Sequence, residues 1–338
     1  MTIAAAQLGA FDSAEAKDRV SHELTAIARA TEWLNAPRPT IASLTGKVVL
    51  VDFWTYTCIN WLRTLPYVRA WSHKYTQGLT VVGVHTPEFP FERNIDNVRR
   101  AAAQMNVEYP IVIDNDHSIW NAFKNQYWPA LYVLDPQGRI RHHQFGEGEY
   151  ERSERAIQQL LSRAGVTGIS NAIVTVEGSG FEAPADVANL RSPETYVGYE
   201  RAENFASRND AAPNQRRDYG APSRLLLNQW SLSGEWTIGA QATLLNKASG
   251  QLAYRFHARD VHLVMGPQPA GHSVRCRVTI DGQPPGSAHG LDVDEHGNAT
   301  IVEQRLYQLI RQPKPIVDRT CAIEFLDAGV EVFSFTFG

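Results

Sequence analysis

From Gly46 to Ala164 the sequence alternates between short apolar runs rich in β-branched residues and longer amphipathic stretches. The runs KVVLVDFWT, LTVVGVHT and YPIVID have the length of buried strands. A fourth stretch, ALYVLDPQGRIRHHQF, contains an Asp-Pro-Gln-Gly turn and predicts a hairpin. Helices are expected between these runs, the last one over Glu151–Ala164. Strands that alternate with helices and end in a hairpin predict an α/β sheet with helices on both faces.

The character of the sequence changes after Gly165. Residues 177–224 are rich in Gly, Pro, Asn, Asp and Arg, whereas short alternating runs separated by turn signals begin near Leu225 and predict a β-sandwich or jelly roll. Residues 14–35 are charged and amphipathic, which predicts a helix. The expected parts are a helical N-terminal extension (1–31), the α/β domain (32–167), an irregular connecting segment packed with the β domain (168–224) and the β-sandwich (225–338).

Charge and cysteine content narrow the possible partners and compartments. The net charge is −4 and no run rich in Lys or Arg occurs, which argues against nucleic acid and anionic membranes as partners. No apolar stretch is long enough to span a bilayer, and the first twenty residues lack the pattern of a secretory signal. The three well-separated cysteines do not form a disulfide framework. These features predict a cytoplasmic protein, or a periplasmic one if the natural N-terminus is missing.

The segment VDFWTYTCINW places Cys58 just after a buried strand, at the predicted start of a helix. Free N–H groups and the positive end of the helix dipole favour the thiolate at such a position, so we expect a nucleophilic cysteine with a lowered pKa. The flanking Thr55, Thr57 and Asn60 are polar, which argues against a purely structural, buried thiol.

The segment GKVVLVDFW…C…LP resembles the active-site segment of the thioredoxin superfamily. Asp52 lies six residues before the cysteine, as the buried aspartate of that family does, and Trp128-Pro129 matches its cis-proline loop. The resemblance implies a thioredoxin fold of the redoxin (AhpC/TSA) type, with a mixed central sheet. It also implies that Pro129 presents the Trp128 backbone to a substrate and that a buried Asp52 moves protons, with a buried carboxylate that has no catalytic role as the alternative.

A narrower resemblance covers residues 32–338. The motifs FWTYTCIN, VHTPEF, YWPALYVLD and HHQFGEGEY resemble the thioredoxin-like part of the DipZ-type cytochrome c biogenesis proteins. The motifs SPETYVGYERAENF, DVHLVMGP and EQRLYQLIRQP resemble their C-terminal β domain, which is similar to a carbohydrate-binding module. The resemblance implies that the β domain binds a carbohydrate or a protein.

One departure from the family pattern bears directly on the chemistry. The family motif is C-x-x-C, and here it reads Cys58-Ile59-Asn60-Trp61. In a dithiol enzyme the second cysteine resolves the mixed disulfide that the first one forms, and an indole cannot do this. Cys276 and Cys321 lie in phase with the apolar residues of their predicted strands, so we expect buried core thiols, with a disulfide between them as the alternative.

Several neighbours of Cys58 are candidates for the wall of the site or for substrate contact: Trp54, Thr55, Tyr56, Thr57, Asn60, Trp61, Trp128 and Glu88. Glu88 is also a candidate acid or base, with a plain loop carboxylate as the alternative. No cofactor and no metal site is expected, because the adjacent His142 and His143 point to opposite faces of a strand. Trp230, Trp236, Tyr196 and Tyr199 are candidates for stacking on sugar rings, with a core role as the alternative.

Three functions remain open at this point. The first is a thiol-disulfide oxidoreductase that uses Cys58 alone, with protein or small thiols as partners and an external thiol to resolve the mixed disulfide. The second is a one-cysteine peroxidase, supported by the T-x-x-C fragment Thr55–Cys58 and weakened by Val51, where peroxiredoxins carry proline. The third is a redox-inactive binding or scaffold protein that works through its β domain.

Overall fold

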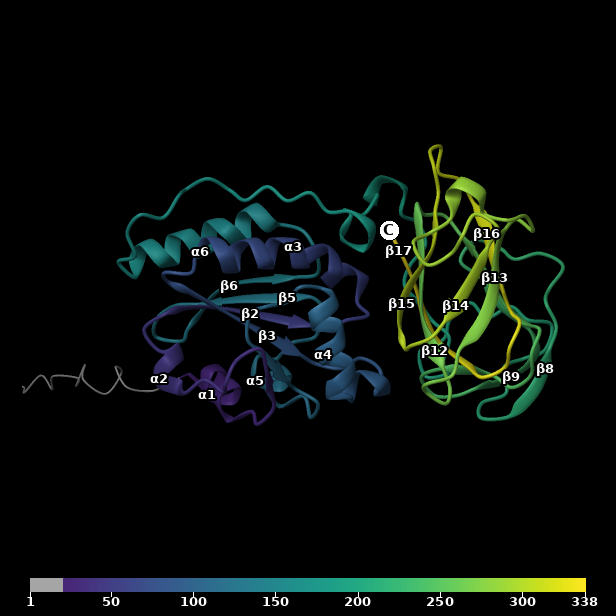
Figure 1. The fold of residues 1–338 in the computed structure, drawn as a ribbon, viewed down its shortest axis with the longest axis horizontal. Coiled ribbons are helices and arrows are strands. Elements are labelled where there is room, and N and C mark those ends of the chain that lie inside the picture. The colour runs from purple at the N-terminus through teal and green to yellow at the C-terminus, as the bar shows by residue number, and fades with distance from the viewer. Residues whose placement is uncertain (1–20) are drawn as a thin grey trace, which may run out of the picture.

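The computed structural model describes residues 21–338, which form two domains lying side by side (Figure 1). The N-terminal domain is built on one sheet with helices on both faces, and the C-terminal domain consists almost entirely of strands. The helix expected over residues 14–35 is described from residue 21 onward; its earlier part lies outside the described residues. No helix within residues 21–338 has the length and apolar character needed to cross a bilayer.

The first sheet has the strand order β1-β4-β3-β2-β5-β6. Strands β2, β3 and β4 run parallel to one another, whereas β1, β5 and β6 pair antiparallel with their neighbours, so the sheet is mixed as the thioredoxin resemblance implies. Its strands are β1 (Trp33–Leu34), β2 (Val48–Trp54), β3 (Leu79–His85), β4 (Ile111–Ile113), β5 (Ala130–Leu134) and β6 (Ile140–Phe145).

The helices cover the two faces of this sheet because alternate residues of β2 point in opposite directions. Val49, Val51 and Phe53 pack in one core with α1 and α5, whereas Val48, Leu50 and Trp54 pack in the other core with α3, α4 and α6. The helices are α1 (His22–Arg29), α2 (Ile41–Leu44), α3 (Ile59–Lys74), α4 (Ile95–Gln104), α5 (Ser118–Ala122) and α6 (Tyr150–Arg163), with a 3₁₀ turn η1 (Pro90–Arg93) before α4.

One predicted element differs from the observed one. Trp33 and Leu34 fall inside the amphipathic stretch that predicts a helix, but they form the edge strand β1, paired with Ile111 and Val112 of β4. Helix α1 already ends at Arg29. Pairing with a sheet edge, which the local pattern does not reveal, overrides the helical periodicity here.

The C-terminal domain is an antiparallel sheet that curls around a second core, in agreement with the predicted sandwich. Its longest path of neighbours is β14-β13-β16-β11-β9-β10-β17-β12-β15. Short β7 pairs with β17, and β8 with β9. The strands are β7 (Thr195–Tyr196), β8 (Arg216–Tyr219), β9 (Trp230–Ile238), β10 (Thr243–Leu245), β11 (Gly250–Phe256), β12 (Asp260–Pro267), β13 (Val274–Ile280), β14 (Asn298–Ile301), β15 (Arg305–Arg311), β16 (Arg319–Phe325) and β17 (Val330–Phe337), and the 3₁₀ turns are η2 (Gly180–Glu182), η3 (Val187–Asn189) and η4 (Gly286–Ala288).

The two domains share an apolar contact. Phe333 of β17 packs against Phe89 and Phe91, with ring centroids 5.1 and 4.9 Å apart. Val264 and Leu306 of the β domain also belong to the core that contains α3. The faces of the two domains are therefore held together by buried side chains.

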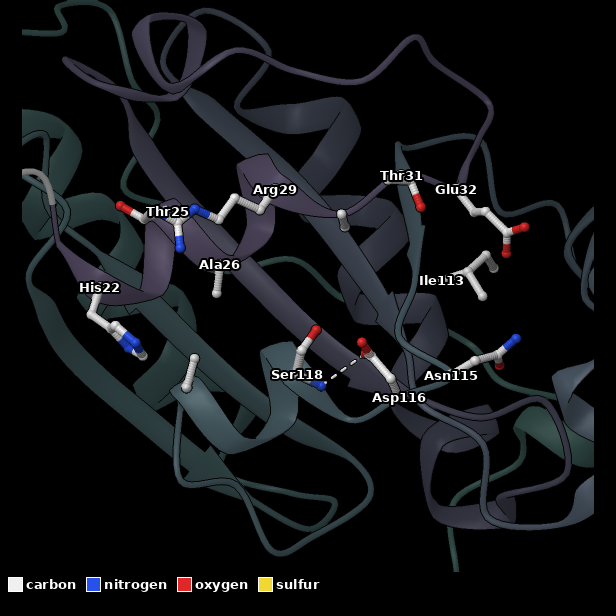
Figure 2. A pocket seen from close by; sticks show the side chains of 12 residues that line it. His22, Thr25, Ala26, Arg29, Thr31, Glu32, Ile113, Asn115, Asp116 and Ser118 are labelled. Atoms are coloured by element: carbon white, nitrogen blue, oxygen red, sulfur yellow. Dashed lines mark hydrogen bonds between the residues drawn. The ribbon is translucent and has the colours of Figure 1, made fainter.

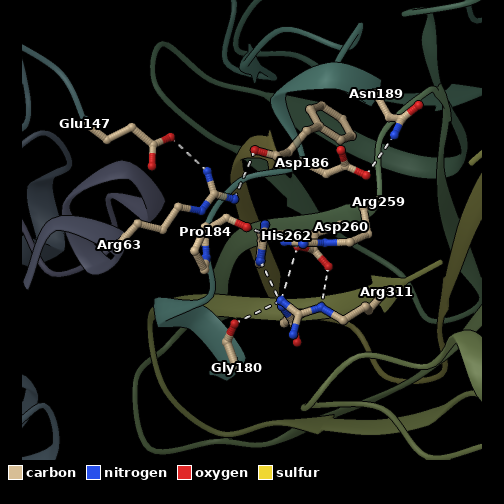
Figure 3. Close-up of polar contacts among 12 residues, drawn as sticks. Arg63, Glu147, Gly180, Pro184, Asp186, Asn189, Arg259, Asp260, His262 and Arg311 are labelled. Carbon is tan, nitrogen blue, oxygen red and sulfur yellow. Dashed lines mark hydrogen bonds and ion pairs between the residues drawn. The ribbon is translucent and has the colours of Figure 1, made fainter. Parts of the chain in front are cut away.

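Polar contacts reinforce this junction (Figure 3). Buried Arg63 of α3 pairs with Glu147 at 3.1 Å and donates to the carbonyl oxygen of Phe337, 3.4 Å away in β17. The segment between the domains is fixed on both sides, because Glu182 pairs with Arg69 of α3 while Arg311 of β15 donates to the Gly180 carbonyl oxygen. These contacts set which part of the β domain faces the end of β2.

Candidate functional site

Cys58 occupies the position that the sequence predicts, at the N-cap of α3. Its backbone is extended, its N–H donates to the Thr55 carbonyl oxygen at 3.3 Å, and its own carbonyl accepts from the Leu62 N–H at 3.0 Å. Cys58 as a residue is partly exposed, whereas residues 51–57 before it are buried. Cys58 is therefore the first residue after β2 that is not fully buried.

A pocket of about 350 Å³ lies over Cys58, between the two domains. The N-terminal domain contributes seven of its lining residues: Cys58, Ile59, Asn60, Glu88, Gln126, Tyr127 and Trp128. The segment before β7, the residues that follow it and the end of β17 contribute the others: Leu190, Ser192, Pro193, Glu194, Tyr196, Arg201, Thr336 and Phe337. The β domain thus forms about half of the pocket that contains the thiol.

Two carboxylates lie in this pocket. Glu88 accepts a hydrogen bond from the Tyr196 hydroxyl at 2.5 Å and pairs with Arg201 at 2.9 Å, while the Arg201 guanidinium lies over the Tyr196 ring. Glu194 lines the same pocket, where desolvation and the negative charge of Glu88 raise the pKa of its carboxyl to about 7. Arg201 is already paired with Glu88, so the charged side chains of the pocket leave an excess of one negative charge when Glu194 is ionised.

The surroundings of Cys58 raise the pKa of its thiol, contrary to the expectation from the helix start. Burial of the sulfur contributes most, and the negative charge of Glu194 adds to it, with a smaller contribution from Glu88. The N–H groups of Trp61 and Asn60 act in the opposite direction but do not compensate. The expected lowering of the thiol pKa is therefore wrong, because residues distant in the sequence outweigh the helix terminus.

Asp52 is fully buried beneath the site, where it contacts Trp61, three residues after Cys58. The Trp61 indole N–H donates to Asp52 Oδ2 at 3.0 Å, and the Tyr109 hydroxyl donates to the same oxygen at 3.1 Å. Trp61 also stacks on Trp54, with ring centroids 4.3 Å apart, and both indoles are fully buried. Burial raises the pKa of Asp52 to about 7, and these two hydrogen bonds oppose the shift.

A second buried carboxylate supports the loop before Cys58. Glu92 accepts from the Thr57 hydroxyl at 2.5 Å and from the backbone N–H groups of Glu88 and Phe89. Burial raises the pKa of Glu92 to about 7. Sequence reasoning missed Glu92, because a charged residue in a predicted helix is normally assigned to its solvent face.

The predicted site residues divide into two groups. Cys58, Asn60, Glu88 and Trp128 line the pocket, and the Trp128–Pro129 peptide bond is cis. The other candidates are not among the residues that line the pocket and are buried beneath the site: Trp54, Thr55, Tyr56, Thr57 and Trp61. Large aromatic groups that follow a buried strand are drawn into the core by the area they remove from water.

Cys276 and Cys321 are free, buried thiols in the core of the β domain. They lie on paired strands but not opposite each other, since Cys276 faces Phe325 and Cys321 faces Ile280. We therefore expect both to resist alkylation in the folded protein and to react once it is unfolded. Mass mapping after iodoacetamide treatment with and without urea checks this; labelling of either thiol in the native protein contradicts it.

The aromatic residues proposed for sugar stacking are mostly core residues. Trp230 and Trp236 are fully buried, so neither indole can lie on a sugar ring in this structure. Tyr196 is half-buried and bonded to Glu88, and Tyr199 is exposed. The suggestion that the two tryptophans bind carbohydrate is therefore wrong.

Besides a cavity of about 700 Å³ beside Phe91 and Phe333, two further cavities larger than the Cys58 pocket lie away from the thiol. One, of about 490 Å³, lies between α1 and the start of α5 and includes His22, Glu32 and Asp116 in its lining (Figure 2). The other, of about 800 Å³, lies between α4 and the β domain and includes Tyr56 and Phe181. No cysteine lines either cavity, and residues 21–338 contain no cluster of three or more metal-ligating side chains of the His, Cys, Asp and Glu types.

Known families and proteins match both domains. A family model described as thioredoxin-like matches residues 46–140, and one described as thioredoxin-like C-terminal domain matches residues 192–338. The chain is 33% identical over 313 residues to protein DipZ of Mycobacterium tuberculosis, an alignment that covers 91% of this chain and 42% of DipZ. The chain therefore spans less than half of the length of that relative.

Smaller relatives match the N-terminal domain alone. The thiol-disulfide oxidoreductase YkuV of Bacillus subtilis is 32% identical over 130 residues, which cover 38% of this chain and 88% of YkuV. The solution structure of a thioredoxin-like protein in its oxidised form is 33% identical and covers 40% of this chain and 90% of its own, with a TM-score of 0.37. The YkuV match, together with the family model over residues 46–140, shows that the chain belongs to the thioredoxin-like thiol-disulfide oxidoreductases.

Proposed function

We propose that this protein exchanges thiols and disulfides through the single nucleophilic sulfur of Cys58. The Cys58 thiolate attacks a disulfide R–S–S–R′, forms Cys58–S–S–R and releases R′–S⁻. An external thiolate R″–S⁻ then attacks the substrate sulfur, forms R–S–S–R″ and restores the Cys58 thiolate. Protein thiols and small thiols are both possible partners for this cycle.

The observation that carries the proposal is the placement of the three cysteines and Trp61. Cys58 is the only one of the three that lines a pocket, because Cys276 and Cys321 are buried in the other domain. Trp61 fills the position from which a second thiol would attack, and its side chain is locked between Asp52 and Trp54. An intramolecular resolution step therefore has no group to perform it.

Further residues have supporting roles in this proposal. Trp128 lines the pocket beside Cys58, so its backbone next to Pro129 is placed to contact an extended substrate or a small thiol. Asp52 acts as a positioning residue, since its carboxylate is bonded to Trp61 and Tyr109. This differs from the proton-transfer role that the family resemblance implies.

A peroxidase is less well supported than disulfide exchange, because a relative that matches the N-terminal domain, YkuV, is named a thiol-disulfide oxidoreductase. A peroxidatic cysteine reacts as a thiolate, which is favoured by a neighbouring positive charge. The guanidinium in the Cys58 pocket, that of Arg201, is paired with Glu88, and the carboxylates disfavour the thiolate. Nothing in the pocket therefore favours the peroxidase over disulfide exchange.

The proposal predicts that a disulfide traps the protein as a mixed disulfide at Cys58. After incubation with hydroxyethyl disulfide at pH 8, intact mass analysis should find one adduct per chain, stable until reduced glutathione is added. Cys58→Ser should form no adduct, whereas the control Cys276→Ala should behave as the parent. If the folded parent forms no adduct, the result supports a redox-inactive binding or scaffold protein. If the adduct disappears without added thiol, the result contradicts the single-thiol cycle.

A further inference from the structure

The acidic side of the Cys58 pocket suggests which substrates the site accepts. Glu194 has no ion-pair partner among the described residues, whereas Glu88 is paired with Arg201. The remaining polar side chains of the pocket are amides and hydroxyls: Asn60, Gln126, Tyr127, Ser192, Tyr196 and Thr336. Neither lysine nor histidine lines the pocket, so the pocket carries a net negative charge when Glu194 is ionised.

We propose that the Cys58 pocket selects thiols and disulfides that carry an ammonium or guanidinium group close to the sulfur, with Glu194 as the carboxylate that receives the cation. This deepens, and rests on, the proposed single-thiol exchange. The pocket volume of about 350 Å³ lies at the lower end of the range for small-molecule sites, so a small aminothiol or one extended residue of a basic peptide fits.

The same carboxylates also control the reactivity of the sulfur. Burial of Cys58 and the negative charge of ionised Glu194 hold the thiol in its protonated form. A cation beside Glu194 offsets that charge, which stabilises the thiolate at the moment when the substrate sulfur is present. The thiol should therefore react more slowly with neutral and anionic reagents than with cationic ones.

The β domain supplies this selectivity. Glu194 directly precedes β7, and β7 is held to β17 by the pairing of Tyr196 with Ser334 and of Thr195 with Phe335. The Val197 N–H donates to the Phe333 carbonyl oxygen at 3.0 Å, and Phe333 packs on Phe89 and Phe91 of the other domain. The pairing of β7 with β17 therefore holds Glu194 in the pocket that contains Cys58.

The test compares three disulfides of similar size that differ in charge: cystamine, hydroxyethyl disulfide and 3,3′-dithiodipropionate. Rates of mixed-disulfide formation at Cys58 are measured by mass spectrometry in the full-length parent and in Glu194→Gln. The ratio of the cystamine rate to the hydroxyethyl disulfide rate cancels the change in thiol ionisation within each protein. We expect this ratio to fall about tenfold in the variant, as for the loss of one nearby charge, and to fall with added salt in the parent.

Alkylation by neutral iodoacetamide gives a second measurement, and here the rate should rise in the variant instead of falling. Loss of the Glu194 charge lowers the thiol pKa, so Glu194→Gln should be alkylated faster than the parent at pH 7.5. Glu151→Gln, on the exposed side of α6, is the matched control and should change neither rate. If Glu194→Gln fails to fold, Glu88→Gln replaces it with the same two expectations.

The outcomes separate the two proposals. Equal rate ratios in the parent and in folded Glu194→Gln overturn the charge selectivity and leave the single-thiol exchange intact. A folded parent that forms no adduct with any of the three disulfides between pH 7 and 9 overturns the exchange itself, and the selectivity with it. A parent that prefers the anionic disulfide also overturns the assignment of Glu194.

Discussion

Replacement of Trp61 by cysteine should remove about 3–5 kcal/mol from the free energy of unfolding and at the same time create a dithiol site. The loss follows from the position of the indole, which is fully buried and stacked on Trp54. Truncation of a buried tryptophan leaves a cavity, and the cost of such changes falls in this range. The variant also leaves Asp52 Oδ2 with Tyr109 as its remaining donor.

The gain of chemistry follows from helix geometry. Residue 61 lies three positions after Cys58 at the start of α3, which places the two side chains on the same face of the helix. A thiol there can attack a mixed disulfide at Cys58 and release the substrate without an external thiol. Folded Trp61→Cys should therefore turn over in an insulin-reduction assay in which the parent accumulates as an adduct.

Trp61→Phe is the matched control for both effects. Phenylalanine keeps much of the buried aromatic volume but lacks the N–H group that donates a hydrogen bond to Asp52. It also has no thiol and therefore cannot resolve a mixed disulfide. It should lose less stability than Trp61→Cys in urea unfolding followed by circular dichroism, and it should show no gain in turnover. A folded Trp61→Cys protein as inert as the parent is incompatible with a site that lacks only its resolving thiol.

Stability should fall as the pH rises from 5 to 8, and Asp52→Asn should remove much of this fall. In the folded protein the pKa of Asp52 is about 7, because the carboxyl is fully buried. The ordinary pKa of an aspartate side chain, which we take for the unfolded state, is 3.8. The folded state thus binds the proton more tightly than the unfolded state does. The stabilisation is fully present below pH 3.8 and is lost progressively as the pH approaches 7.

Between pH 5 and 8 this one group should lower the free energy of unfolding by about 3 kcal/mol. Glu92, with a pKa raised to about 7 by burial, acts in the same direction and accounts for a remaining slope in the variant. Asn mimics the protonated acid and still accepts from Trp61 and Tyr109, so Asp52→Asn should be more stable than the parent at pH 8.

Urea unfolding at a series of pH values checks this expectation. Glu151→Gln, which alters an exposed carboxylate on α6, should reproduce the pH dependence of the parent. A parent whose stability is constant or rises between pH 5 and 8 would show that Asp52 is ionised in the folded protein at little cost. In that case Trp61 and Tyr109 solvate its carboxylate more effectively than burial penalises it.

The sequence by itself determined the parts of the protein that depend on short-range pattern. The apolar run over Val48–Trp54 predicted β2, the following polar stretch predicted the start of α3 at Cys58, and the turn after Leu134 predicted the β5–β6 hairpin. Such elements form because they bury residues at a regular spacing, and this spacing can be recognised within a short stretch of the sequence. The phase of Cys276 and Cys321 predicted their burial for the same reason.

Tertiary structure decided the chemistry around the thiol. The sequence places Cys58 at a helix start, which favours the thiolate, but Glu194 comes from the other domain and burial comes from packing, and both favour the thiol. Likewise, Trp61 reads as a missing cysteine in the sequence, whereas in the fold it is the hydrogen-bond partner of Asp52 and a stacking partner of Trp54. Electrostatic and packing energies depend on distances in space, and residues far apart in the chain set those distances only once the two domains are joined.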